Sequence, residues 1–153
     1  MKTIGKIQNN FYVVQISPKK FNVEFRTNKY VIKIHNFKCD DDLSEETLAY
    51  KGDLIINNDK IGVVSNDGQG GGANIVVYKK YHSNYKEVIQ ELKEIENYCF
   101  PSNYDMESVM DELSALLSLI RTNDTITRVE ESISMANTVA DEYRKKFYFS
   151  LNK

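Results

Sequence analysis

The sequence of 153 residues has no tryptophan, only two prolines, two cysteines and two histidines. Cys39 and Cys99 lie far apart and lack the spacing of a zinc site, so neither a disulfide framework nor a metal centre is predicted. In a reducing cytosol both are expected to be free thiols. Neither His35 nor His82 is paired by sequence with a nucleophile, so no catalytic residue and no cofactor are predicted. An enzyme is therefore the less favoured class.

The sequence also lacks a long hydrophobic run and a marked excess of charge. No apolar run approaches the roughly 20 residues that span a bilayer, and the first ten residues lack the apolar stretch of a signal peptide. We therefore expect a cytoplasmic protein with no membrane partner. Twenty basic and twenty-two acidic side chains give a net charge of −2. Nucleic acid is not expected as a partner, although residues 79–82 and 143–146 mix basic and aromatic side chains.

The first 81 residues contain a series of predicted strands, rich in aromatic and β-branched residues and separated by turn-forming residues. They are 11–16, 21–25, 30–37 and 74–81, together with the two strands of a hairpin that turns within residues 56–60. The alternation of Phe21, Val23 and Phe25 predicts a sheet with one buried face and one solvated face. We expect five or six antiparallel strands.

From residue 83 the hydrophobic period changes from two to about 3.6, which predicts three amphipathic helices. The first is expected to run to near Cys99, the second over 105–120, and the third to about residue 147. Cap pairs are predicted at Asn84 with Glu87 and at Thr127 with Glu130. The apolar stripe of the third helix either packs on the protein's own sheet or second helix, or forms the seam of a homodimer. Its residues are Val129, Ile133, Ala136, Ala140, Tyr143 and Phe147.

These elements predict the α+β class, with an antiparallel β-sheet from the N-terminal half packed by three C-terminal α-helices. One domain is expected over 1–153, mainly β over 1–81 and mainly α over 83–149. Between the two parts of the sheet, residues 39–46 hold five carboxylates in eight positions. Their spacing matches no calcium loop, so a solvated loop is predicted there rather than a metal site.

The stretch SNDGQGGGAN, residues 65–74, holds four of the seven glycines. Successive glycine N–H groups can point into one concavity and hold a phosphate or carboxylate. Phosphate loops and dinucleotide-binding fingerprints both need a helix directly after the glycines, whereas a strand follows here, so both are excluded. A binding loop and a structural hairpin in which Asp67 caps the loop's own amides both stay open. A hydrolytic pair of Asp67 and His82 is a further alternative.

The stretch Leu48–Asn74, in which NNDKIG is followed by SNDGQGGG, resembles a family of small uncharacterised bacterial, phage and plasmid proteins with an NDGxGG loop motif. The later runs YDMESVMDELSALL and YRKKFYF are similar to that family's acidic helix and basic tail, so the resemblance covers about residues 48 to 149. The chain departs from the pattern at Gln69, where an aromatic residue or histidine is expected, and at Gly72, where a cysteine or small polar residue is common. The resemblance implies a mobile-element setting in a bacterial or phage-infected cell, without an established enzymatic activity.

We therefore expect a small non-catalytic binding protein that holds an anionic small ligand or a host protein, such as an inhibitor or sponge of a host defence pathway. The alternatives are a hydrolytic enzyme around Asp67 and His82, or an oligomeric structural protein. A captured nucleotide would need cations near the glycine-rich loop. The predicted binding residues are Asn66, Asp67, Gly68, Gln69, Gly70, Gly71, Gly72 and Asn74, with Lys79, Lys80 and Arg121 as the cations.

Overall fold

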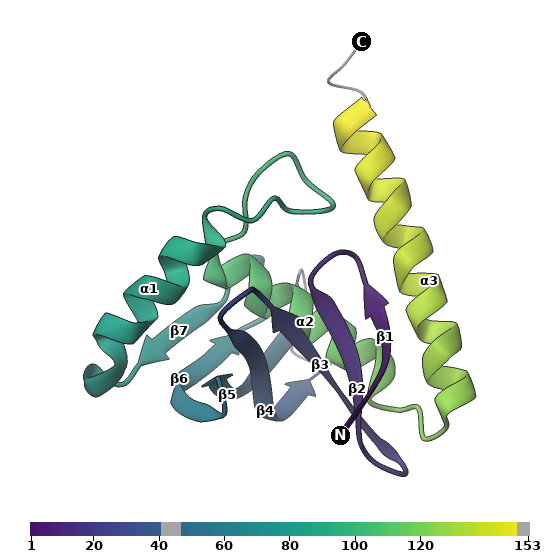
Figure 1. Ribbon diagram of the computed structural model, residues 1–153, viewed down its shortest axis with the longest axis horizontal. Coiled ribbons are helices and arrows are strands. Elements are labelled where there is room, and N and C mark those ends of the chain that lie inside the picture. Colours follow the sequence, from purple (N-terminus) through teal and green to yellow (C-terminus); the bar gives the residue numbers. More distant parts are fainter. Residues whose placement is uncertain (41–46, 150–153) are drawn as a thin grey trace.

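The structure is a computed structural model that describes residues 1–40 and 47–149 (Figure 1). The strands are β1 (Lys2–Ile7), β2 (Phe11–Ser17), β3 (Lys20–Arg26), β4 (Val31–Asp40), β5 (Ala49–Ile56), β6 (Asp59–Asn66) and β7 (Asn74–Val77). The helices are α1 (His82–Leu92), α2 (Met106–Ile120) and α3 (Ile126–Arg144), with a 3-10 turn at Lys79–Tyr81 and a π-helical turn at Lys145–Phe149. Most of the acidic run predicted as a solvated loop, residues 41–46, lies outside the described residues.

All of these strands form one sheet, in which each strand pairs antiparallel with the next in the order β1 to β7. The predicted α+β class and antiparallel sheet are therefore confirmed. The sheet has seven strands within the described ranges instead of five or six. The sequence of β1, KTIGKI, mixes lysines and a glycine with two isoleucines, and pairing with β2 makes it a strand where local propensity does not.

The turn between β5 and β6 is built as its sequence predicts. Asn57 and Asn58 have φ angles of 49° and 70°. A two-residue type I′ turn needs positive φ at both central positions, and asparagine tolerates that region better than most residues. The predicted hairpin is confirmed.

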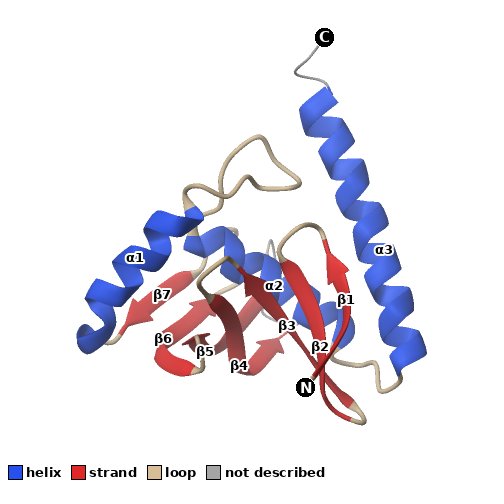
Figure 2. Cartoon of the chain, in the orientation of Figure 1, coloured by secondary structure: helices blue, strands red, loops and turns tan. Residues whose placement is uncertain are grey.

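The core lies between the sheet and the helices. In Figure 2, α2 crosses behind β3 and β4, while α1 and α3 lie at opposite ends of the sheet. The ring of Phe25 lies 5.0 Å from the ring of Phe11 and 5.0 Å from that of Tyr104, both edge to face. At the start of α2, Asp105 and Ser108 form a reciprocal capping box. None of the helices in 1–40 and 47–149 is both long enough and apolar enough to cross a membrane.

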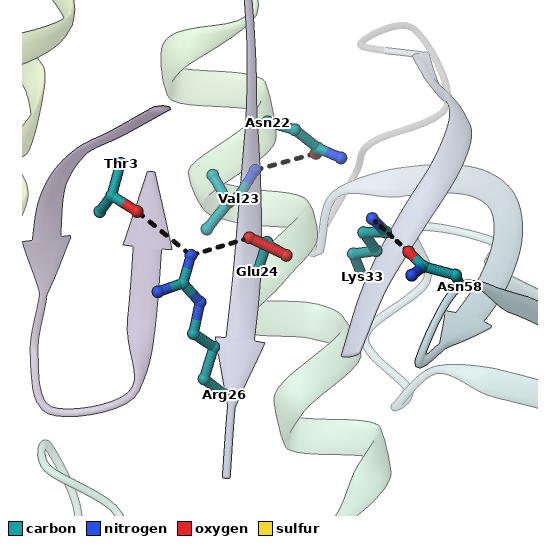
Figure 3. A network of polar contacts seen from close by, with 7 residues as sticks. All are labelled: Thr3, Asn22, Val23, Glu24, Arg26, Lys33 and Asn58. Carbon is teal, nitrogen blue, oxygen red and sulfur yellow. Dashed lines mark hydrogen bonds and ion pairs between the residues drawn. The ribbon is translucent and has the colours of Figure 1, made fainter. Parts of the chain in front are cut away.

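The outer face of the sheet, opposite α2, is only partly solvated, which corrects the prediction of one wet face. Glu24 of β3 is 3% exposed and Lys33 of β4 is 7% exposed. Figure 3 shows Glu24 accepting from Arg26 (3.0 Å), Arg26 also donating to Thr3 (3.3 Å), and Lys33 donating to Asn58 (3.4 Å). Long side chains of neighbouring strands lie over one another at the centre of a wide sheet, and they shield these charges from water.

The first helix is shorter than predicted. α1 ends at Leu92, seven residues before Cys99, and residues 93–105 form the long loop that follows α1 in Figure 1. Asn84 and Glu87 lie within the helix, where no side chain caps the first turn, so the predicted cap pair is wrong. Tyr104 at the end of this loop is 3% exposed, and its burial in the core overrides the helical pattern.

The third helix begins close to the predicted position but with a different cap. The hydroxyl of Thr125 accepts from the backbone N–H of Arg128 (3.3 Å), so Thr125 caps α3 and Thr127 with Glu130 does not. A threonine two residues earlier supplies the same bond, which the local motif could not distinguish. The C-terminal half of α3 extends past the β1–β2 turn (Figure 1).

Candidate functional site

The glycine-rich loop, residues 67–73, joins β6 to β7 and is held by Asn66. The side-chain oxygen of Asn66 accepts from Thr47 Oγ1 (3.1 Å) and Gly68 N (2.9 Å). Its side-chain nitrogen donates to the Gly71 carbonyl (3.0 Å) and to Asp111 Oδ1 of α2 (3.3 Å). Four is the full hydrogen-bonding capacity of an asparagine amide. Asn66 is therefore fully engaged in closing the hairpin against α2.

The amides of the loop are also used internally. Besides Gly68 N, Gln69 N donates to Asp67 Oδ1 (3.0 Å) and Gly70 N donates to Thr47 Oγ1 (3.3 Å). The alternative in which Asp67 caps the loop's own amides is thus confirmed. Gly68 and Gly70 have φ angles of 81° and 96°, which explains glycine at both positions. The amides at 68, 69 and 70 would have to break these bonds to hold an anion.

The structure does not bring the predicted cations to this loop. Lys79 and Lys80 follow the far end of β7, in an exposed 3-10 turn and not in a strand over 74–81. Arg121 is the C-cap of α2, whereas a Cβ at Gly72 would lie 2.6 Å from Glu107 Oε2 in the first turn of that helix. These two ends of α2 are about 20 Å apart at 1.5 Å per residue. Among the described residues, Glu107 lies beside Gly72 and Asp111 accepts from Asn66, and both carboxylates oppose an anion.

The hydrolytic pair is not assembled either. Asp67 lies in the loop before β7 and His82 follows this strand, whose own length is about 10 Å at 3.3 Å per residue. His82 Nε2 lies 3.0 Å from the carbonyl oxygen of Val77. The strand runs straight along β6 and does not return one side chain toward the other. Asn74 and Gln69, the remaining predicted binding residues, are exposed at the start of β7 and in the loop.

A groove of about 470 Å³ lies between α2 and α3 and reaches the 93–105 loop. We call it the α2–α3 groove. Its walls are Ala115 and Leu119 of α2 and Met135, Val139 and Tyr143 of α3. The α3 residues recur every four positions, so they form one stripe along the helix.

Five large apolar side chains that line this groove are exposed, although Leu116 beneath them belongs to the core. Met135 is 57% exposed, Val139 and Tyr143 are each 46% exposed, and Leu119 is 37% exposed. Phe100 of the loop, which also lines the groove, is 42% exposed. Single exposed apolar residues are common on protein surfaces, but several around one hollow form a contiguous apolar patch. The small side chains of the alanines at 136 and 140, which also line the groove, leave the space between the helices unfilled.

A polar network fixes α3 against the β1–β2 turn. Gln8, with a φ of 59°, donates its backbone N–H to Asn137 Oδ1 (2.9 Å), and Asn137 donates to the Lys6 carbonyl (2.9 Å). The Gln8 side chain donates to Glu112 Oε1 (2.8 Å) and accepts from the hydroxyl of Tyr104 (3.2 Å). Gln8 therefore ties the sheet, both helices and the loop together at the edge of the groove.

The end of α3 holds the loop that reaches the groove. The Arg144 guanidinium lies over the rings of Tyr98 (4.7 Å) and Tyr148 (4.6 Å) and donates to the Tyr98 carbonyl (3.1 Å). The hydroxyl oxygen of Tyr148 lies 2.6 Å from the carbonyl oxygens of both Asn97 and Phe100. These contacts position the ring of Phe100 beside the groove.

A second pocket of about 290 Å³ shares Gln8, Cys99, Phe100 and Glu112 with the groove. Desolvation raises the pKa of Glu112, the negative charge of Asp111 raises it further, and the hydrogen bond from Gln8 opposes the shift. Desolvation also raises the pKa of Cys99 to about 11, which keeps this thiol protonated and unreactive at neutral pH. Throughout 1–40 and 47–149, no three His, Cys, Asp or Glu side chains are grouped to hold a metal ion.

The groove was not predicted from the sequence. The stripe assigned to the third helix includes Ala136, Ala140 and Tyr143 but omits Met135 and Val139, which make the apolar face wider than packing on the sheet requires. The extra width of this apolar face was the sequence feature from which the groove could have been predicted. No protein-family model matches the chain, and neither the curated proteins nor the solved structures contain a match. The resemblance to the NDGxGG family stays a prediction from its motifs.

Proposed function

We propose that this protein is a non-catalytic binding module that takes an apolar segment of another protein into the α2–α3 groove. The observation that carries the proposal is the convergence of exposed apolar side chains from two helices and a loop on one hollow. Covering such surface gains about 25 cal/mol per Å² of apolar area removed from water. An amphipathic partner helix laid in a groove uses anchors three or four residues apart, and the Met135, Val139 and Tyr143 stripe has this spacing.

The internal bonding of the glycine-rich loop supports this location for the site. A loop whose amides and asparagine are already paired has little to offer an anionic ligand. The separation of Asp67 from His82 and the raised pKa of Cys99 support a non-catalytic role. That the partner is a host protein, in a bacterial or phage-infected cell, rests on the resemblance of residues 48–149 alone.

The experiment is a selection of random twelve-residue peptides displayed on phage, followed by affinity measurements on the enriched peptides. Val139→Glu places a charge on the groove wall, and Ile16→Glu is the matched control at an equally accessible apolar residue, 52% exposed on β2. We expect enriched peptides with apolar anchors at helical spacing, bound at least tenfold more weakly by Val139→Glu than by Ile16→Glu. Circular dichroism verifies that both variants keep their helix content.

Three outcomes would overturn the proposal. They are no enrichment, equal binding to both variants, and enriched peptides without apolar anchors. A second copy of the chain is the other occupant to be tested, since the stripe on α3 could pack against itself. Sedimentation of the wild-type protein across a hundredfold range of concentration decides this: a dimer that Val139→Glu dissociates would assign the groove to self-association.

A further inference from the structure

Glu112 is a carboxylate at the point where the apolar groove meets the smaller polar pocket. Its Oε1 accepts from Gln8 Nε2 at 2.8 Å, and within the described part of the chain it has no further hydrogen bond and no ion pair. Among these residues, no buried side-chain oxygen lacks a hydrogen-bond partner. The unpaired Oε2 of Glu112 must therefore be reached by solvent, and so it opens onto one of the two hollows.

The charges near the groove are of both signs, since Lys146 lies beside Val139, Glu142 and Tyr143, whereas those nearest Glu112 on its own helix are acidic. Asp111 is adjacent on α2, and its charge acts on Glu112. On α3, Glu131 lies four residues before Met135 and Glu142 lies three residues after Val139, so both are on the rim beside the apolar stripe. A partly buried carboxylate without a counter-charge is costly, and a cation delivered by a ligand would remove that cost.

We propose that the segment bound in the α2–α3 groove carries a lysine or arginine, and that Glu112 is the residue that pairs with it. The inference rests on the proposed function and narrows it to a partner segment with apolar anchors and one basic side chain. The methylene groups of such a side chain lie along the apolar wall while its charged end reaches Oε2. Gln8 holds Oε1 and orients the carboxylate toward the ligand.

The arrangement also explains how other segments would be rejected. A neutral residue at this position would cover Glu112 and leave its charge unpaired, and an acidic residue would add repulsion. Specificity for a basic residue thus has two sources. Segments without one bind more weakly because Glu112 is left unpaired, and segments with one gain an ion pair.

The test is a double-mutant cycle. The probes are the most enriched twelve-residue peptide, acetylated and amidated, and the same peptide with its basic residue replaced by norleucine. The proteins are the wild type, Glu112→Gln and, as a matched control, Glu131→Gln on the rim. Glutamine at 112 keeps an oxygen that can accept from Gln8, so the fold is preserved. We expect the norleucine peptide to bind wild type and Glu131→Gln at least tenfold more weakly than the basic peptide, a difference of about 1.4 kcal/mol. On Glu112→Gln the two peptides should differ less than twofold.

Different experimental outcomes would refute this inference and the proposed function. If both peptides bind tightly and equally to wild type, or the enriched peptides contain no basic residue, the role of Glu112 is refuted while groove binding stands. If no peptide is enriched, octylammonium and octanol serve as probes in NMR titrations. If the cation site exists, the amide resonances of α2 and α3 should show larger chemical shift changes with octylammonium than with octanol, and this difference should be lost in Glu112→Gln. Equal chemical shift changes with the two probes would refute the cation site.

Discussion

Replacing Asn66 by alanine should destabilise the protein by about 2–3 kcal/mol. The side chain makes four hydrogen bonds, each of which contributes about 1 kcal/mol net. The Gly71 carbonyl and the Thr47 hydroxyl can recover part of this from water, whereas Gly68 is buried. For a chain of this size the loss corresponds to a decrease in Tm of about 4–12 °C. Urea unfolding measures it as a lower midpoint at an unchanged m value.

Asn66→Asp distinguishes the contribution of the size of this side chain to stability from that of its hydrogen bonds. Aspartate keeps the size but cannot donate, and it places a second carboxylate where the amide nitrogen lies 3.3 Å from Asp111 Oδ1. At neutral pH we expect a loss at least as large as for alanine, and a partial recovery at acidic pH, where one carboxyl of the pair is protonated. The control is Asp67→Asn, which keeps an acceptor for Gln69 N and should change stability by less than about 0.5 kcal/mol. If both Asn66 variants match the wild type within that margin, the loop is not held as described.

Three further predictions concern individual residues. Gly62→Ala should cost about 1–3 kcal/mol in urea unfolding, because its Cβ would clash with the backbone of β7, whereas Gly71→Ala, with open space around it, should be neutral. Since burial raises the pKa of Glu112 in the folded state, wild-type stability should fall as pH rises from the unfolded pKa through the folded one. Glu112→Gln should remove this part of the pH dependence of stability. An unchanged pH dependence in the variant would show that Glu112 is not its cause. At pH 8 a thiol reagent should modify Cys39 in the native protein but modify Cys99, with its pKa of about 11, only on unfolding, and rapid native labelling of both would contradict this.

Most of the strands and the positions of the three helices could be predicted because their patterns are local. The Asn57–Asn58 turn and the apolar period of α2 each identify an element without knowledge of the rest of the chain. The end of α1 could not be predicted, since it depends on the burial of Tyr104 against Phe25, far away in the sequence. β1 likewise becomes a strand through its partner β2.

The candidate site was harder to predict because it is made by distant segments. The glycine-rich loop is easily recognised in the sequence. Its position beside carboxylates, with Arg121 at the far end of α2, is known only from the structure. Glu112 has no local signature that distinguishes it from other acidic residues of a helix. The role that we propose for it is inferred from its hydrogen bond to Gln8, more than one hundred residues earlier, and from the apolar walls of the groove.

Locating a bound peptide on the protein would show whether the α2–α3 groove is the binding site. The enriched peptide, carrying a benzophenone at one apolar anchor, is irradiated with the wild-type protein, and the modified residues are mapped by mass spectrometry. We expect attachment on α2 and α3, centred on Met135 and Val139, and its loss in Val139→Glu. Attachment to residues 67–73, or to the outer face of the sheet, would contradict it.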